Sequence, residues 1–154
     1  RSCSPKPWKL SSVIRRMAIR MLSYSEMSLR TSFLSRFRYL ALDGELGVAT
    51  FGFDRHLNQK FYASGAWKRT RDLIIIRDNG CDMGMEGHEI HDRILVHHMN
   101  PIQVSDLVHF NEEILDPEFL ICVSTRTHNA IHFGDERRLP SPIVERRPGD
   151  TKLW

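Results

Sequence analysis

The fold class that this sequence predicts is α+β, with two helices followed by a small unit of strands and one further helix. Three observations predict it. Apolar residues recur with a helical period before residue 80, and short apolar runs of strand length follow between residues 81 and 123. Proline and basic residues without a clear period occupy the two ends, which are therefore expected to be extended arms. A chain of 154 residues has room for one compact domain.

The overall composition is that of a water-soluble protein. Hydrophobic residues make up 41% of the chain and charged residues 27%, and no apolar run approaches the roughly 18 residues of a membrane span. We therefore expect no membrane contact and a cytoplasmic location. The three cysteines are an odd number without CxxC spacing, which indicates neither a disulfide framework nor a cysteine zinc site. Cys81 and Cys122 are expected to be small buried residues.

Positive charge is concentrated in the first 40 residues. This segment contains nine Lys and Arg residues and one acid, Glu26, so it carries +8 in a chain whose net charge is +3. The remaining residues therefore carry −5. Any affinity for nucleic acid outside the first 40 residues has to come from local clusters of cations.

The chain before residue 51 is expected to contain a leader, a helix and a loop. Residues 1–20 are interpreted as a basic, disordered leader, and Met21 offers an alternative translation start. A helix is expected from Ser25, and the Asp43-Gly44 pair would end it within the segment 21–50. Its apolar residues recur at steps of four, four and three, and they are Leu29, Phe33, Phe37 and Leu40.

A second helix is expected over residues 59–78. Trp67, Ile74 and Ile75 would lie on its inner side, and the Asn79-Gly80 pair is a strong stop signal. The residues expected on the exposed side are basic, and they are Lys60, Lys68, Arg69 and Arg71.

Short strands and helices are expected in the rest of the chain. Residues 81–96 are interpreted as a β-hairpin that turns near Asp92, and a short helix is expected around residues 104–108. Residues 119–123 have the length and apolarity of a strand. Thr125 or Thr127 would cap a helix that ends at Gly134, and a proline-rich extended arm would cover residues 136–154.

Four of the eight histidines lie in two tight pairs. His128 and His132 are four residues apart on the expected helix, so both imidazoles project from one face. His97 and His98 are adjacent on a strand, whose side chains point to opposite faces as long as the strand stays regular. If the strand frays after His98, both rings can instead converge on one cleft.

Each pair alone is also explained by ordinary structure. A pair at helical spacing occurs on solvated helices, and adjacent histidines on a strand can be one buried and one exposed residue. Together, however, they supply three metal ligands and one additional histidine. A structural zinc site has no use for the fourth histidine, whereas a hydrolytic site needs a base to take a proton from water.

Three stretches of the chain resemble the HNH nuclease family. Residues 96–102, VHHMNPI, resemble its first block, in which a histidine pair ends a strand and a proline-containing turn follows. Residues 119–135, FLICVSTRTHNAIHFGD, resemble its second strand and metal-binding helix. Residues 61–81, FYASGAWKRTRDLIIIRDNGC, are similar to the helix that precedes the hairpin in small phage-encoded members. The histidine pattern is most similar to the nuclease domains of DNA-cleaving colicins.

The resemblance implies a ββα-metal (HNH) finger in a nuclease domain over residues 51–135. It implies that His97, His128 and His132 bind one divalent metal ion and that His98 is the general base. The family has an Asn at the start of the second strand, where it fixes the loop that carries the catalytic His. Phe119 occupies that place here, so Asn100 or Asp116 is expected to orient the loop.

The residues and the resemblance together favour a metal-dependent DNA endonuclease. Three neutral imidazoles suit zinc or nickel, and magnesium or manganese remains open as the working ion. A histidine base has an ordinary pKa of about 6.5 and is largely neutral at physiological pH. The cations expected to contact phosphate are Arg126, Lys68, Arg69 and Arg71.

Two alternatives stay open. One is a binding module that keeps a structural metal and docks double-stranded DNA or a phage packaging protein without cutting. The other is a metal-dependent ribonuclease. The leading interpretation takes double-stranded DNA as the partner and, for a phage-encoded protein, the host cytoplasm as the location.

Overall fold

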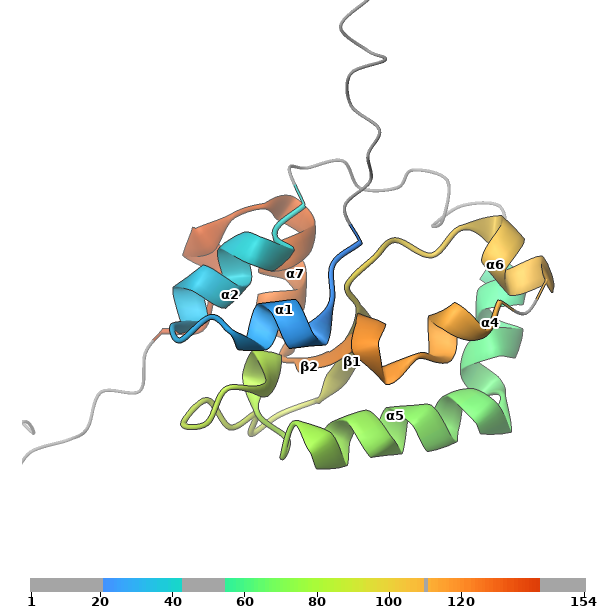
Figure 1. Cartoon of the computed structure of the whole chain (residues 1–154), viewed down its shortest axis with the longest axis horizontal. Coiled ribbons are helices and arrows are strands. Elements are labelled where there is room, and N and C mark those ends of the chain that lie inside the picture. Colours follow the sequence, from blue (N-terminus) through green and yellow to red (C-terminus); the bar gives the residue numbers. More distant parts are fainter. Residues whose placement is uncertain (1–20, 43–54, 110, 142–154) are drawn as a thin grey trace, which may run out of the picture.

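A two-stranded antiparallel sheet lies at the centre of the computed structural model, which describes residues 21–42, 55–109 and 111–141. Strand β1 (Leu95–His98) pairs with β2 (Leu120–Val123), and His98 lies opposite Leu120. Helix α5 (Gly65–Arg77) runs along one face of this sheet (Figure 1). The expected α+β class is confirmed at this level.

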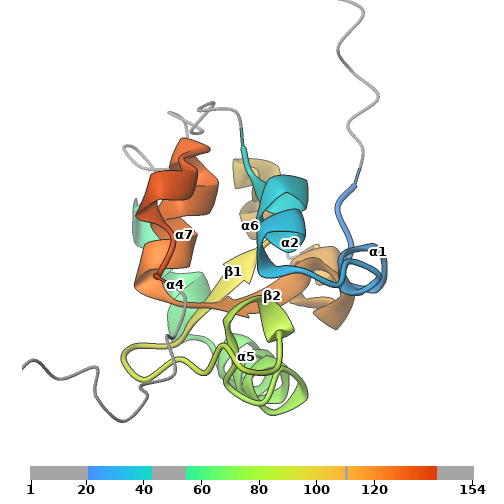
Figure 2. The same ribbon diagram turned by 90° about the vertical axis from the view of Figure 1, so that its left-hand side faces the viewer.

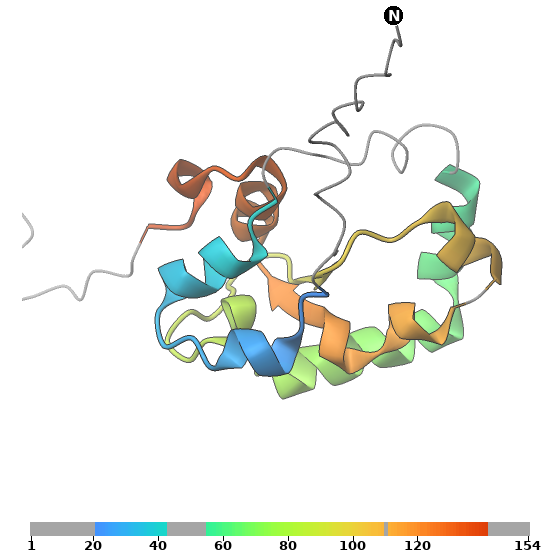
Figure 3. The same cartoon turned by 45° about the horizontal axis from the view of Figure 1, so that its top comes forward.

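Three helices cover the opposite face of the sheet (Figure 2). They are α1 (Tyr24–Ser28), α2 (Phe33–Leu40) and α7 (Thr125–Phe133). Helices α4 (Arg55–Ala63) and α6 (Val104–His109) pack together at the end of the structure that is remote from α7 (Figure 3). Among the described residues, no helix is both long and apolar enough to span a membrane.

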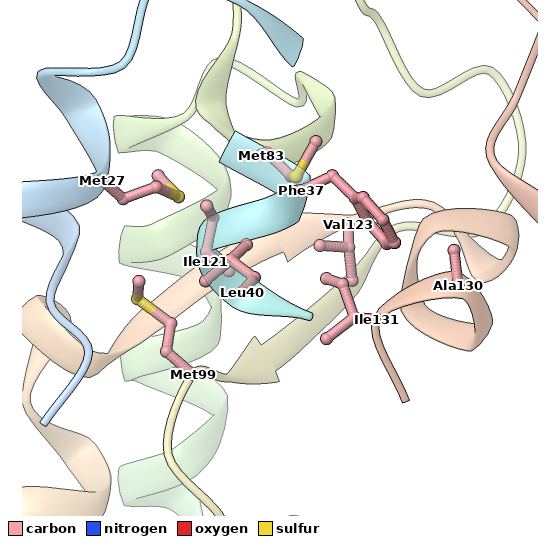
Figure 4. Close-up of a cluster of buried hydrophobic side chains, with 9 residues drawn as sticks. All are labelled: Met27, Phe37, Leu40, Met83, Met99, Ile121, Val123, Ala130 and Ile131. Carbon is pink, nitrogen blue, oxygen red and sulfur yellow. The ribbon is translucent and has the colours of Figure 1, made fainter. Parts of the chain in front are cut away.

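Alternation along the two strands divides the interior into two hydrophobic clusters. Leu95, Ile121 and Val123 face the cluster shared with α1, α2 and α7, which is drawn in Figure 4. Val96, Leu120 and Cys122 face the second cluster, which α5 covers. The members of this cluster that come from the helices and loops are Phe61, Trp67, Ile74, Leu107 and Ile114.

Several expectations about packing are confirmed. Cys81 and Cys122 are buried and free, and Trp67 and Ile74 lie on the inner side of α5. The exposed residues of α4 and α5 include Lys60, Lys68, Arg69 and Arg71, as expected. The stop at Asn79-Gly80 is confirmed, since α5 ends at Arg77 and both residues have positive φ. Cys3 and the leader 1–20 lie outside the described residues.

Both expected N-terminal helices are divided in two. The single helix predicted from Ser25 is wrong because Ser32 begins a new helix, where its side chain and that of Ser35 form a reciprocal capping box. Leu29 is consequently 79% exposed, and Met27 is the buried residue of α1. The helix predicted over residues 59–78 is interrupted at Ser64, whose hydroxyl accepts from the amide of Trp67 at 3.1 Å. The end expected at Asp43-Gly44 lies outside the described residues.

The hairpin predicted over residues 81–96 is also wrong. Residues 82–84 form a 3-10 helix, η2 (Asp82–Gly84), in which Met83 and Gly84 have φ of 51° and 59°. An isolated bridge between Cys81 and Glu89 replaces the expected ladder. β1 pairs instead with β2, which buries all four of its residues and therefore offers a better partner than the exposed segment before it.

The start of α7 and the segment that follows it differ from expectation as well. Ser124, and neither expected threonine, caps α7, and its hydroxyl accepts from the amide of Thr127 at 3.1 Å. The helix ends at Gly134 as expected, with φ of 63°. The predicted arm begins with a 3-10 helix, η5 (Glu136–Arg138), and an ion pair between Arg38 and Glu136 joins it to α2. Residues 142–154 lie outside the described residues.

Candidate metal centre

Three histidines from two elements gather on one face of the sheet. His97 projects from β1, and His128 and His132 project from the same side of α7, one turn apart. One ring nitrogen of each histidine lies within 4.8 Å of a ring nitrogen of the other two. The structure therefore brings together the three residues that the family resemblance implies as metal ligands.

The His97 ring meets the other two rings at steep angles. The His97 ring lies 5.2 Å from His128 and 5.1 Å from His132 between centroids, with interplanar angles of 90° and 86°. The Nε2 atoms of His128 and His132 are 3.2 Å apart. Two nitrogens that bind one zinc ion lie at most about 4.2 Å apart, because each Zn–N bond is about 2.1 Å long. The helical pair satisfies this limit.

Burial favours the neutral form of all three rings. His97 is only 6% exposed, and its pKa lies well below the ordinary value, first because of burial and then because of its histidine neighbours. Burial also lowers the pKa of His128 and of His132. A neutral imidazole has a nitrogen lone pair to give to a metal ion, so this donor set fits a divalent ion of the zinc type.

Two buried aspartates fix the strand that leads into α7. Asp78 accepts from the amide of Cys122 at 2.7 Å, and Asp82 accepts from the hydroxyl of Thr127 at 2.6 Å and the amide of Ser124 at 3.2 Å. These contacts occupy the edge of β2 that does not face β1. They hold the start of α7, and with it the spacing of His128 from β1.

Arg77 completes this edge. Its guanidinium pairs with Asp78 at 2.8 Å and donates to the carbonyl oxygens of Leu120 and Pro117 at 2.8 and 2.6 Å. Burial raises the pKa of Asp82, and its hydrogen bonds with Thr127 and Ser124 oppose that shift. Sequence reasoning missed Arg77, Asp78 and Asp82. The Arg-Asp pair beside the helix stop at Asn79-Gly80 was the available signal.

His98 lies on the opposite face of the strand from His97. Its ring stacks on Trp67 with a centroid distance of 5.1 Å and an interplanar angle of 18°, and its Nε2 lies 2.9 Å from the carbonyl oxygen of Ile114. Of the two alternatives for His97 and His98, the structure therefore has the one in which the strand stays regular and the side chains point to opposite faces. Burial lowers the pKa of His98 to about 4, below the ordinary value that the sequence suggested.

The two candidate loop-orienting residues each hold a backbone segment. The Asn100 side chain accepts from the amide of Leu22 at 2.8 Å and donates to its carbonyl oxygen at 2.9 Å. Asp116 caps the 3-10 helix η4 (Pro117–Phe119) by accepting from the amide of Glu118 at 2.8 Å. Asn100 therefore fixes the chain after β1, and Asp116 fixes the chain before β2. Their role in orienting a catalytic loop remains a prediction.

The candidate phosphate contacts are exposed but lie in two layers. Lys68, Arg69 and Arg71 are on α5, and Arg71 pairs with Asp72 at 2.7 Å. Arg126 is in the first turn of α7, on the other side of the sheet. The α5 cations thus belong to the layer that contacts His98, and Arg126 belongs to the helix of the three-histidine site.

Comparisons of this chain with protein-family models, with curated proteins and with solved structures found no match.

Proposed function

We propose that this protein is a metal-dependent endonuclease of the HNH type that hydrolyses phosphodiester bonds of DNA. The observation that carries the proposal is the meeting of His97, His128 and His132, with one nitrogen of each ring within 4.8 Å of the others. The order of elements supports it, since β1, β2 and α7 occur in the strand, strand, helix order of a ββα-metal finger, with α6 and two 3-10 helices inserted between the strands. His98, next to one ligand and on the opposite strand face, supplies the additional base that hydrolysis requires.

In this proposal His97, His128 and His132 hold one divalent ion. Bound there, the ion would bind the scissile phosphate and stabilise the negative charge that develops on the phosphoryl oxygens and on the leaving oxygen. The site draws on two elements, so an ion would also join β1 to α7. Zinc and nickel suit the all-nitrogen donor set best.

His98 acts as the general base in this proposal. A carbonyl oxygen only accepts hydrogen bonds, so the contact with Ile114 requires the proton of a neutral His98 ring to be on Nε2. Nδ1 then carries the lone pair and can take a proton from water. The water oxygen bonds to phosphorus as the bond to the 3′ oxygen breaks, and the leaving 3′ oxygen takes a proton from solvent water, which gives a 5′-phosphate and a 3′-hydroxyl.

A binding module with a structural metal is a second candidate, because the three histidines join two elements that the chain must hold together. Its binding partner would be DNA or a phage packaging protein, and it would need no catalytic general base. In this alternative, the contacts of His98 with Trp67 and Ile114 are packing alone. A metal-dependent ribonuclease would use the same residues as the leading proposal on a different nucleic acid.

Cleavage of supercoiled plasmid by the full chain tests the proposal. We expect nicked and linear products with at least one of zinc, nickel, magnesium and manganese, and none with a chelator in excess. A parallel reaction with single-stranded and duplex RNA separates the ribonuclease from the deoxyribonuclease. Metal binding without cleavage of either nucleic acid would favour the binding module.

A further inference from the structure

We propose that Trp67 is a positioning residue for His98, and that α5 thereby sets the rate of the proposed hydrolysis from its inner face. This inference rests on the proposed function. The observation behind it is the near-parallel stacking of the indole on the imidazole, at 5.1 Å and 18°. None of the three clustered histidines takes part in this contact, because His98 projects from the other face of β1 than His97.

Aromatic residues from two helices surround the His98 ring. Phe61 and Tyr62, near the end of α4, lie 6.1 and 6.5 Å from it between centroids, at angles of 52° and 64°. Trp67, in the first turn of α5, is 6% exposed and is the ring that stacks face to face. Phe61 and Tyr62 themselves contact Trp67 at 5.3 and 5.1 Å, so the three rings support one another.

The break between α4 and α5 creates this arrangement. A continuous helix would carry residues 61, 62 and 67 around one cylinder, whereas the interruption at Ser64 lets the chain turn between them. The Ser64 hydroxyl accepts from the Trp67 amide itself, which fixes the backbone from which the indole projects.

Two contacts of different kinds determine how the His98 ring sits. The Ile114 carbonyl fixes which edge of the ring points toward it, because a flip of the ring would replace Nε2 with a carbon atom. The Trp67 face fixes the plane of the ring. With both in place, Nδ1 is held in one direction, and a base held in one direction can meet the attacking water without a search.

Replacing Trp67 with Leu keeps an apolar side chain and removes the flat face. Trp67→Phe restores an aromatic face, and Ile74→Ala is the matched control, because Ile74 is 1% exposed in the same helix and the same cluster. All three are made in the full chain, and thermal stability and zinc affinity are measured for each. Steady-state cleavage of a short duplex then gives kcat and KM.

We expect Trp67→Leu to lower kcat by at least about tenfold and to leave KM within about twofold, since the variant impairs orientation rather than binding. Trp67→Phe should recover most of the kcat. Ile74→Ala should keep kcat near the wild-type value even where its loss of thermal stability equals that of Trp67→Leu. A kcat for Trp67→Leu equal to that of Ile74→Ala would overturn the inference.

A readout that needs no cleavage separates failure of this inference from failure of the proposed function. Nitrogen NMR of the wild-type protein should show His98 protonated on Nε2 alone. In Trp67→Leu we expect averaged signals from a ring that changes tautomer and orientation, with recovery in Trp67→Phe. Unchanged His98 signals in Trp67→Leu overturn the positioning role, whether or not the wild type cuts DNA. If Trp67→Leu gives averaged His98 signals and the wild type does not cut DNA, Trp67 still positions the ring, and the proposed nuclease activity is wrong.

Discussion

The three clustered histidines differ in burial, and this difference predicts how their substitutions behave. His97 is 6% exposed between β1 and α7, whereas His128 and His132 are partly exposed on one face of α7. His128→Ala and His132→Ala should each abolish tight zinc binding and change the free energy of unfolding by no more than about 1 kcal/mol. His97→Ala should lose zinc binding and also destabilise the fold.

Calorimetric titration with zinc and denaturation with urea measure these two effects. His91→Ala is the matched control, because His91 is an exposed histidine outside the cluster. Unchanged stoichiometry and affinity in all three cluster variants would show that these histidines are not a metal site.

Zinc should also stabilise the wild-type fold. An ion that binds only the folded chain adds about 2.7 kcal/mol to the free energy of unfolding at a concentration 100 times its Kd. The melting temperature should therefore rise with zinc and return to its starting value with a chelator. The same titration of His132→Ala should leave the melting temperature where it was. If zinc does not change the melting temperature of the wild type, the three clustered histidines do not bind it.

At the residue scale the sequence predicted the cluster of His97, His128 and His132 better than the surroundings of His98. Helical spacing placed His128 and His132 on one face, and strand alternation allowed His98 to point away from His97. The partners of His98 come from α4, from α5 and from the 3-10 helix η3 (Glu112–Leu115), and no local pattern joins those segments to β1. Contacts of this kind depend on tertiary packing.

At the element scale, the contacts along the edge of β2 that does not face β1 position the start of α7. Asp82 accepts one hydrogen bond from the amide of Ser124, the cap of α7, and one from the hydroxyl of Thr127 in the first turn of α7, and Asp82→Ala would leave both groups without that partner. We expect a loss of about 1–3 kcal/mol in the free energy of unfolding. Zinc affinity should fall as well, because the start of α7 is no longer held.

Urea denaturation measures the loss, and Asp92→Ala, at an exposed position, is the control. An Asp82→Ala protein with the same denaturation midpoint as the control would contradict the role given to this carboxylate.

The elements that the local sequence predicted well are those whose bounds are set by residues inside or next to them. The short helix α6, the end of α5 and the end of α7 follow from helix-forming and helix-stopping residues. The divisions at Ser32 and Ser64 were missed because an apolar period continues across a capping serine. The pairing of β1 with β2 was missed because the partner strand lies beyond α6 in the chain.

At the scale of the whole molecule, basic charge and the candidate site occupy different parts of the sequence. Residues 1–20 contain six Lys and Arg residues and lie outside the described part of the structure. Deleting them should lower the salt dependence of DNA binding, by up to about 0.9 in the logarithmic slope for each phosphate that these cations neutralise. Zinc affinity should stay the same, since the deletion removes none of the three clustered histidines.

Fluorescence anisotropy on a short duplex at several salt concentrations measures this slope. Identical slopes for the full and shortened chains would leave DNA binding to the exposed cations of α5 and α7, which are Lys68, Arg69, Arg71 and Arg126.

Cleavage by a metal-loaded His98→Ala protein tests the central claim most directly. His98 is not among the three clustered histidines, so the variant should bind zinc with the affinity of the wild type. Without its base, the rate of plasmid cleavage should fall by at least about 100-fold. A metal-loaded His98→Ala protein that cuts plasmid within a few-fold of the wild-type rate would contradict the assignment of His98 and the mechanism built on it.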